Sequence, residues 1–285
     1  MSELRVWKYQ ATGNDFVMTY DPDDRRPLSA DEVRALCDRR FGVGGDGSIR
    51  VTAGTDGRPF MDYRNADGSL AEMCGNGLRC VALLLRDVGE PGSSFEVETR
   101  SGTRRVELSP DGRVSVEMGE PNFTKAAIPM RGPAWETYLR EPFDLGGGVL
   151  VTATAVSMGN PHLVLFVEDD PERFHVAHIG AVLERDDRFP EGTNVEFAKV
   201  TEEGILARVW ERGSGETMAC GSGACAIAVA ANEAGLAGAR STVRFPGGDL
   251  DVERLQSGSI LLTGPASRVF ETTIDLDALM AAIDA

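Results

Sequence analysis

An internal repeat constrains the fold of this chain more than any other feature. One offset of 146 positions (for example, 220 − 74) relates four ordered pairs of short motifs, at Gly13 and Gly159, Cys74 and Cys220, Gly77 and Gly223, and Gly102 and Gly248. The offset is close to half of the 285 residues. We therefore expect two similar halves related by an approximate two-fold axis.

The pattern of apolar residues predicts the same elements in both halves. Short alternating segments between Gly, Asp and Pro turns predict strands over 6–9, 16–19, 48–52, 60–64, 95–99, 104–108 and 113–118, and over 150–156, 163–167, 195–200, 205–211, 242–245, 250–253 and 259–262. A helical pattern follows Cys-Gly-x-Gly in each half, and the second of these, 224–231, is apolar on every side, as in a buried helix. We expect an α/β protein with two barrel-like sheets, each wrapped around a central helix.

The halves define the expected domains. Residues 1–121, joined by the C-terminal segment 270–285, form the half that carries Cys74, and residues 122–269 form the half that carries Cys220. Clefts between domains are common ligand sites, so we expect the active site there. Two further helices are predicted, one opened by a capping box at 29–32 and one over 276–283.

Composition excludes several classes of function. The net charge of −16 argues against nucleic acid and anionic membranes as partners. There is neither a membrane-length apolar run nor a signal peptide at the start, so we expect a soluble cytoplasmic protein. The five cysteines form no Cys-x-x-Cys pair, and the three lysines lie outside any glycine-rich phosphate loop. We expect no metal site and no pyridoxal or other cofactor.

Cys74 and Cys220 each directly precede a Gly-x-Gly turn that opens a helix. The free N–H groups of a helix start favour a thiolate and can also bind a carboxylate. If both starts hold one carboxylate, one thiolate can remove the α-proton while the opposite thiol delivers a proton to the other face. This arrangement inverts a stereocentre. The three other cysteines, at 37, 80 and 225, are expected to be small core residues.

Other polar residues recur near these cysteines. Asn65 and Glu211 each lie nine positions before their cysteine, and the Glu211-Arg212 pair suits the ammonium and carboxylate of an amino acid. The alternative for that pair is a surface ion pair. Turn residues are the alternative for Asn14, Asn160 and Asn194, and a satisfied core side chain is the alternative for His162.

Together these segments resemble the diaminopimelate epimerase family. The matching motifs are Ala11–Phe16, Gly42–Gly47, Arg64–Ser69, Met73–Cys80, Gly159–His162, Gly192–Val195, Trp210–Gly213 and Ala219–Gly223, in family order. The resemblance implies a cofactor-independent epimerase that interconverts LL- and meso-2,6-diaminopimelate in lysine and peptidoglycan-precursor biosynthesis. It also implies two α/β barrels and a homodimer.

The resemblance also assigns site residues. It makes Cys74 and Cys220 the two acid–base residues, with the reacting carboxylate held at the amides of Gly75, Asn76, Gly221 and Ser222. Glu211 meets the reacting ammonium, Arg212 meets the distal carboxylate, and Asn14, Asn65, Asn160 and Asn194 read the distal end. His162 tunes the site. Some family members have a site-contacting glutamine where this chain has Gly47, so that contact is lost or replaced here.

Three other functions remain open. A proline racemase or hydroxyproline epimerase would share the fold and the facing thiols, but the polar distal-end residues favour a two-headed substrate. A thiol redox protein is disfavoured by the absence of Cys-x-x-Cys. An amino-acid-binding protein without activity would not need cysteine at both helix starts.

Overall fold

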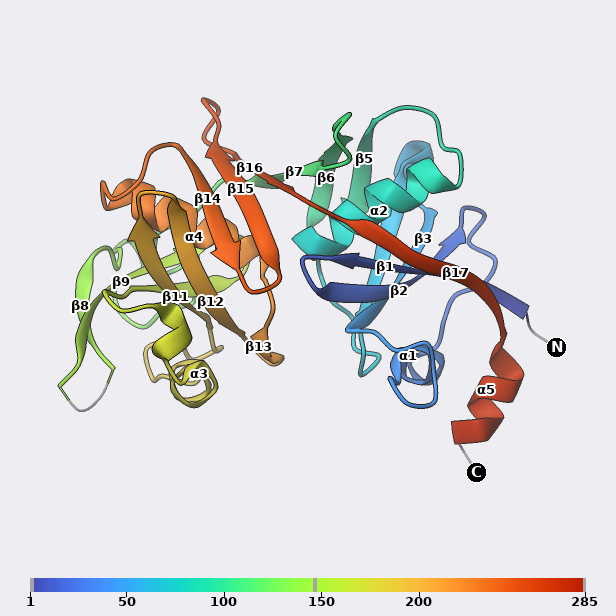
Figure 1. Ribbon diagram of the computed structural model, residues 1–285, viewed down its shortest axis with the longest axis horizontal. Helices are drawn as coiled ribbons and strands as arrows, with labels where there is room; N and C mark the ends of the chain where they lie inside the picture. The colour runs from blue at the N-terminus through green and yellow to red at the C-terminus, as the bar shows by residue number, and fades with distance from the viewer. Residues whose placement is uncertain (1–2, 146–147, 284–285) are drawn as a thin grey trace. The chain divides into compact units, whose positions relative to one another are not determined.

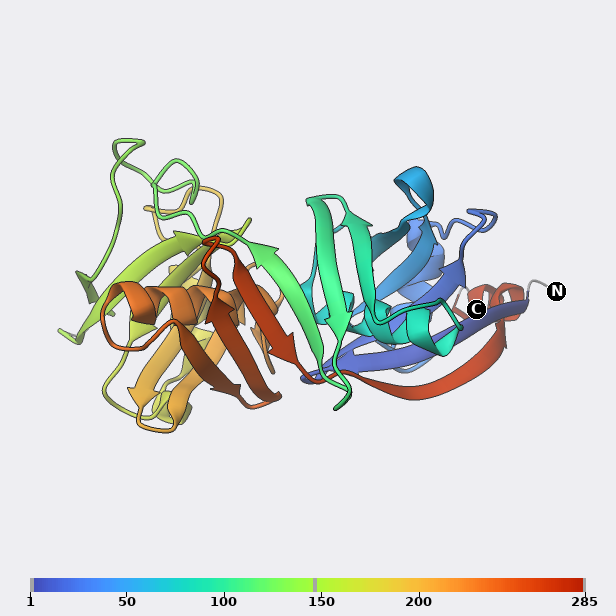
Figure 2. The ribbon, with the colours of Figure 1, turned by 90° about the horizontal axis from the view of Figure 1, so that it is seen from above.

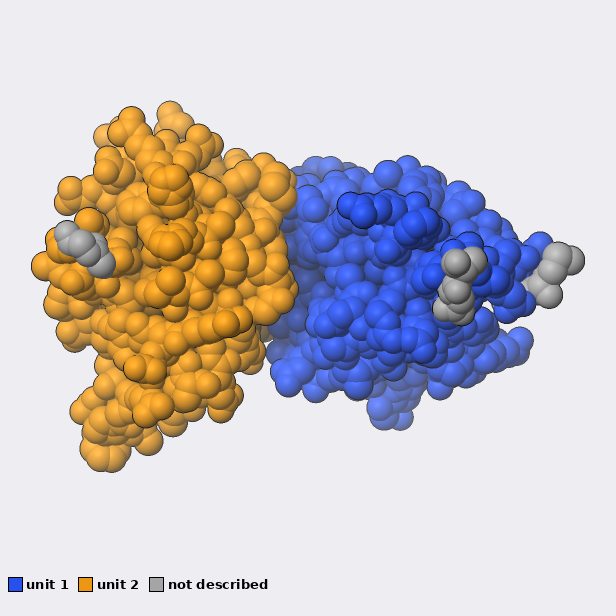
Figure 3. All heavy atoms as spheres, turned by 90° about the horizontal axis from the view of Figure 1, so that it is seen from below, with its two compact units in different colours: residues 1–116, 264–285 blue, residues 117–263 orange. Residues whose placement is uncertain are grey.

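The computed structural model describes residues 3–145 and 148–283. The chain forms two compact units, coloured separately in Figure 3. Unit 1 contains residues 1–116 and 264–285, and unit 2 contains residues 117–263. The C-terminal segment thus belongs to the same unit as the N-terminal residues. The unit boundaries lie at 116/117 and 263/264, a few residues before the expected 121/122 and 269/270.

Unit 1 is a sheet with helices between its strands (Figure 1). Its elements are β1 (Glu3–Ala11), β2 (Asn14–Asp21), α1 (Ala30–Cys37), β3 (Gly47–Ala53), β4 (Pro59–Asn65), α2 (Gly75–Asp87), β5 (Ser94–Thr99), β6 (Gly102–Leu108), the start of β7 (Val114–Gly119), β17 (Ser267–Asp275) and α5 (Leu276–Ile283). The strands pair in the order β17-β1-β2-β3-β4-β5-β6-β7, and the β2/β3 and β4/β5 pairs are parallel.

Unit 2 repeats this pattern. Its elements are β8 (Glu141–Asp144), β9 (Leu150–Ser157), β10 (Pro161–Phe166), α3 (Val176–Leu183), β11 (Asn194–Thr201), β12 (Gly204–Glu211), β13 (Gly215–Thr217), α4 (Gly221–Glu233), β14 (Arg240–Phe245), β15 (Gly248–Arg254) and β16 (Ile260–Gly264). The order is β8-β9-β10-β11-β12-β14-β15-β16, again parallel at the third and fifth pairings, and β13 adds a short antiparallel pairing to β12.

The element boundaries follow the offset seen in the sequence. Helices α1 and α2 and strands β5 and β6 all reappear 146 positions later as α3, α4, β14 and β15 (for α2, 75 + 146 = 221). The predicted repeat is therefore confirmed at the level of secondary structure, and so are all the strands predicted from alternation. The fold class is confirmed as two similar barrel-like sheets, each with its own helix.

The central helices form the core of their units. Every residue of α2 from Gly75 to Leu85 is buried, and α4 is buried from Gly223 to Ala231. Helix α2 contacts β1, β2, β5, β6 and β17, while α4 contacts β9, β10, β11, β14 and β15 (Figures 1 and 2). Burying each leucine of α2 stabilises the fold by about 1.5–3 kcal/mol. This packing holds the N-terminus of each helix in place.

Several elements were not predicted from the sequence, namely β8, β13, β17 and α3. Strand β17 pairs with β1, and its side chains from Ser267 to Thr273 are exposed, so no alternation marks it. The capping box of Ser29 and Glu32 at α1 is confirmed, as is the terminal helix α5, whose Leu276 packs in one cluster with Val33 and Leu36. None of the described helices combines the length and apolar character needed to cross a membrane.

Candidate active site

Cys74 is the N-cap of α2. Its backbone is extended (φ −144°, ψ 119°), and its Sγ accepts a hydrogen bond from the amide of Gly77 at 3.4 Å. A Cβ at Gly77 would lie 2.6 Å from Met61 Cε and 2.8 Å from Ile49 Cδ1, so a side chain there would require these two side-chain ends to shift. The partly exposed thiol also donates to Asn14 Oδ1 at 3.7 Å. The glycine therefore lets the helix start lie against the sheet with its thiol outward.

Asn14 is oriented by a charged network that the sequence did not reveal. Its Nδ2 donates to Asp46 Oδ2 at 2.8 Å, and its Oδ1 accepts from Asn76 Nδ2 at 3.3 Å. Asp46 also bonds Arg39, which pairs with Asp15. Although burial opposes ionisation, hydrogen bonds from Arg39 and Lys8 hold the pKa of Asp15 well below its usual range. Asn14 and Asn76 thus lie together at the thiol of Cys74.

Arg79 is fully buried in α2 and holds Asn76 in position. Its guanidinium donates to Asn76 Oδ1 at 2.9 Å and to Thr12 Oγ1 at 3.1 Å, and it also bonds the carbonyls of Pro265 and Gly75. Because Arg79 binds the oxygen of the Asn76 amide, the Nδ2 of that amide faces Asn14. A lone arginine five residues after a helix-start cysteine was the available signal, and it was not recognised.

Asn65 lies at the end of β4, where its Nδ2 donates to Ser69 Oγ at 3.0 Å. It pairs across the strands with Gly47. A Cβ at Gly47 would lie 2.6 Å from the carbonyl oxygen of Arg64 and 2.7 Å from Tyr63 Cε2. The Tyr63 ring, packed edge-on against Phe16, therefore occupies the space that a side chain at position 47 would need.

Cys220 is the N-cap of α4 and repeats the geometry of Cys74. Its backbone is extended (φ −119°, ψ 123°), and its Sγ accepts from the amide of Gly223 at 3.3 Å. The Ser222 hydroxyl lies 3.4 Å from the sulfur. Cys220 is only 4% exposed. At Cys220 the expected lowering of the thiol pKa by the helix start is outweighed, because burial and the charge of Glu211 raise the pKa well above the usual value, although the amide of Gly223 lowers it.

A chain of hydrogen bonds runs behind Cys220. The Nδ2 of Asn160 donates to Ser222 Oγ at 3.4 Å, while His162 Nε2 lies 2.9 Å from Asn160 Oδ1. The other ring nitrogen of His162 lies 2.6 Å from Glu196 Oε1. The structure therefore brings the predicted residues Asn160, His162 and Ser222 together with Cys220. Glu196 was missed, because it reads as an ordinary residue of an alternating strand.

Glu211, Arg212 and Asn194 lie at the ends of β12 and β11. Glu211 accepts from the Thr217 hydroxyl. Asn194 is 4% exposed, and both ends of its amide bond the backbone, at Pro161 O (2.8 Å) and at the amide of Arg212 (2.9 Å). Asn194 thus ties the Arg212 backbone to the start of β10, and its contact with substrate stays a prediction.

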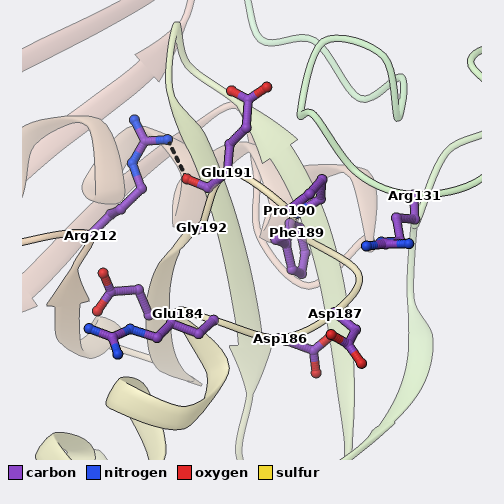
Figure 4. Close-up of a pocket in the computed structure, with 10 residues that line it drawn as sticks. Arg131, Glu184, Asp186, Asp187, Phe189, Pro190, Glu191, Gly192 and Arg212 are labelled. Carbon is purple, nitrogen blue, oxygen red and sulfur yellow. Dashed lines mark hydrogen bonds between the residues drawn. The ribbon is translucent and has the colours of Figure 1, made fainter.

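The Arg212 side chain lines a cavity of about 400 Å³ in unit 2 (Figure 4). Its Nη1 donates to the carbonyl oxygen of Glu191 at 3.1 Å, the dashed line in Figure 4. Glu184 holds the same turn, with its carboxylate accepting from Trp210 Nε1 and from the amide of Gly213.

Within residues 3–145 and 148–283, no group of three or more His, Cys, Asp or Glu side chains is placed to hold a metal ion.

Comparison with protein families finds one match across both units. The family model described as diaminopimelate epimerase matches residues 6–124 and 154–269. A diaminopimelate epimerase of Synechococcus sp. (strain JA-3-3Ab) is 43% identical over 281 residues, which cover 95% of this chain and 98% of the relative. A chloroplastic diaminopimelate epimerase of Oryza sativa subsp. japonica is 42% identical over 279 residues, which cover 94% of this chain and 79% of the relative.

Solved structures share the fold at low sequence identity. A PhzF-family phenazine biosynthesis protein from Bacillus anthracis aligns with a TM-score of 0.69 at 16% identity, covering 96% of this chain and 100% of that protein. A hydroxyproline epimerase from Agrobacterium vitis, with bound trans-4-hydroxy-L-proline, aligns with a TM-score of 0.66 at 13% identity, covering 96% of this chain and 93% of that protein. These likenesses concern the fold alone.

Proposed function

Because this chain belongs to the diaminopimelate epimerase family, a family of isomerases, we propose that it interconverts LL- and meso-2,6-diaminopimelate through two acid–base cysteines. One observation carries the mechanism. In each unit a cysteine is the N-cap of the central helix, with its sulfur bonded to the third amide of that helix (at Gly77 and Gly223). Two such thiols can supply the base and the acid that inversion of a stereocentre needs.

The reaction is a transfer of two protons. The thiolate of one cysteine takes the α-proton, and the electron pair of the C–H bond moves toward the carboxylate. The thiol of the other cysteine then donates its proton to the opposite face of the same carbon, and the two sulfurs end with their protonation states exchanged. The amides of Gly75, Asn76, Gly221 and Ser222 stabilise the charge that develops on the carboxylate. This proton chemistry involves no cofactor.

The surroundings of Cys220 support its assignment as the protonated cysteine at the start of a turnover. Its raised pKa favours the protonated thiol, so Cys220 acts as the acid when the substrate arrives in the matching configuration. Glu211 binds the reacting ammonium, which offsets the negative charge that now disfavours the Cys220 thiolate. Cys74 is then the base in that direction, and the roles reverse in the other.

The remaining polar residues select the substrate. Arg212 binds the distal carboxylate, while Asn14, Asn65, Asn160 and Asn194 bind the distal amino-acid end. A substrate without that end would leave these groups without partners, which is costly.

We also propose that the enzyme is a cytoplasmic homodimer, independent of pyridoxal phosphate, in lysine and peptidoglycan-precursor biosynthesis.

Hydrogen exchange at the α-carbon tests the proposal. The pure protein is incubated in deuterated water under reducing conditions with LL-diaminopimelate, meso-diaminopimelate, L-proline or trans-4-hydroxy-L-proline. We expect one deuterium at the α-carbon of diaminopimelate and none in the imino acids. Exchange in proline alone would indicate a racemase of the same fold. Exchange in none of the four, together with a reversible disulfide between the two cysteines, would indicate a redox protein.

A further inference from the structure

The buried pair of His162 and Glu196 has no counterpart in unit 1. Both side chains are fully buried, and they lie side by side on the parallel strands β10 and β11. His162 pairs with Asn194 in the β10–β11 register, as Phe16 pairs with Gly47 in the β2–β3 register. The unit 1 equivalents of His162 and Glu196 are therefore Phe16 and Ile49. The same fold forms in unit 1 with an apolar pair, so the polar pair is not required by the architecture.

Glu196 lies against the first turn of α4. A Cβ built on Gly223 would lie 3.0 Å from Glu196 Oε1, where the equivalent Cβ on Gly77 would lie 2.8 Å from Ile49 Cδ1. Glu196 Oε2 has no hydrogen-bond partner among the residues that the structure describes. Burying a carboxyl group with one oxygen unsatisfied is destabilising.

The hydrogen bonds fix where the protons are. Asn160 Oδ1 can only accept, so the Nε2 of His162, 2.9 Å away, must be the donor. This orientation of the amide agrees with its other end, since Nδ2 can then donate to Ser222 Oγ. A single proton remains for the 2.6 Å contact between His162 Nδ1 and Glu196 Oε1. Whichever atom holds this proton, the pair as a whole is neutral.

We propose that Glu196 is a positioning residue for the Cys220 side of the active site. By sharing one proton with His162 Nδ1, it fixes the ring with Nε2–H toward Asn160, and this holds the Asn160 amide with its NH₂ toward Ser222 and the thiol. The role of Asn160 toward substrate rests on the proposed function.

Charge supports this assignment. Burial raises the pKa of Glu196, which favours the form that shares a proton with His162. The other acidic group that acts on both Glu196 and Cys220 is Glu211 of β12, which the substrate ammonium neutralises in the proposed function. A neutral His162–Glu196 pair therefore orients Asn160 without adding a second negative charge beside the sulfur.

Three variants separate hydrogen bonding from packing. In Glu196→Gln, the amide can still donate to Nδ1, so we expect kcat/KM within about 3-fold of the parent. In Glu196→Ile, the bond to Nδ1 is lost, and we expect a rise in KM of about 10- to 100-fold with a smaller change in kcat. His162→Phe combined with Glu196→Ile copies the apolar pair of unit 1 and should fold normally with the same rise in KM.

Nitrogen-15 NMR of histidine supplies a readout that is independent of catalysis. The signal of His162 is assigned by its loss in His162→Phe, with His175 and His178 as internal references. We expect Nε2 to be protonated in the parent and in Glu196→Gln, with a downfield proton in the bond to Glu196 in the parent alone. In Glu196→Ile we expect a mixture of tautomers.

Three results would overturn the proposal. They are an unprotonated Nε2 in the parent, an unchanged KM in a folded Glu196→Ile or double variant, and a loss in Glu196→Gln as large as in Glu196→Ile. If the parent shows the expected tautomer but does not exchange the α-proton of diaminopimelate, the proposed function fails and the proton assignment stands.

Discussion

The first turn of α2 is bonded by a buried guanidinium, whereas the first turn of α4 packs against a buried carboxyl group. Arg79 lies at the position that Cys225 occupies in unit 2 (79 + 146 = 225), and Glu196 lies at the position of Ile49 in unit 1. The duplicated backbone thus presents the same N-cap twice, while the charged side chains near it differ: Arg79 bonds the first turn of α2, and Glu211 raises the pKa of Cys220.

In the proposed mechanism this one geometry serves two roles. Inversion needs one thiolate and one thiol at the start of each turnover, and two identical environments would not distinguish them. Asn76 and Ser222 occupy equivalent positions in the two helices (76 + 146 = 222) but have different partners. Arg79 bonds Asn76, whereas Ser222 bonds the sulfur of Cys220 directly. The following predictions test whether the units share geometry and differ in charge.

Removal of either thiol should have the largest effect. In Cys74→Ala and in Cys220→Ala, turnover of both stereoisomers of diaminopimelate should fall by at least ~10³-fold, because each direction needs both groups. Rates are followed by α-deuterium exchange, and folding by circular dichroism. Near-parental turnover in either variant would show that the two units do not share the acid–base role.

Loss of the buried Arg79 side chain should destabilise unit 1 more than loss of the equivalent Cys225 side chain destabilises unit 2. Arg79→Met leaves Asn76 Oδ1 and the carbonyls of Gly75 and Pro265 without this donor, and should cost about 3–5 kcal/mol in the free energy of unfolding. The matched variant Cys225→Ala removes a small buried side chain and should cost about 1 kcal/mol. Urea unfolding measures both, and equal losses would contradict the structural role of Arg79.

Crowding at Gly47 should give a smaller loss of stability. Gly47→Ala places a Cβ against the Arg64 carbonyl and the Tyr63 ring, and should cost about 1–3 kcal/mol. Gly238→Ala is the control, since a Cβ there meets nothing within 4 Å, and it should change stability by less than about 0.5 kcal/mol. If thermal unfolding finds the two variants equally stable, Tyr63 does not block position 47.

The smallest expected effect is a difference between the alkylation rates of the two cysteines. At pH 8 iodoacetamide should modify the partly exposed Cys74 at least about 10-fold faster than Cys220, because burial and Glu211 raise the Cys220 pKa and little of its thiolate is present. The Cys220 rate should climb as pH rises above 9. Glu211→Gln removes a negative charge, lowers that pKa and should speed Cys220 alone, as peptide mass spectrometry can measure. A slower Cys220 in this variant would reverse the sign assigned to Glu211.

Much of the fold was predictable because it depends on local pattern. Alternation predicted the strands with one buried face, and Ser29 and Glu32 predicted the start of α1. Strand β17 could not be found in this way, because its exposed side chains carry no alternation and only its pairing with β1 defines it. The N-cap positions of Cys74 and Cys220 were predictable from the glycines that follow them.

The sequence by itself determined the duplication, the two helix-start cysteines and the family, since each is a matter of spacing along the chain. Only the tertiary structure decided which side chains surround each sulfur, because Arg79, Asp46 and Glu196 act through contacts that register and packing create. The raised pKa of Cys220 has the same origin. Helix-start amides alone would lower it, but burial and the charge of Glu211 on the neighbouring strand β12 outweigh them.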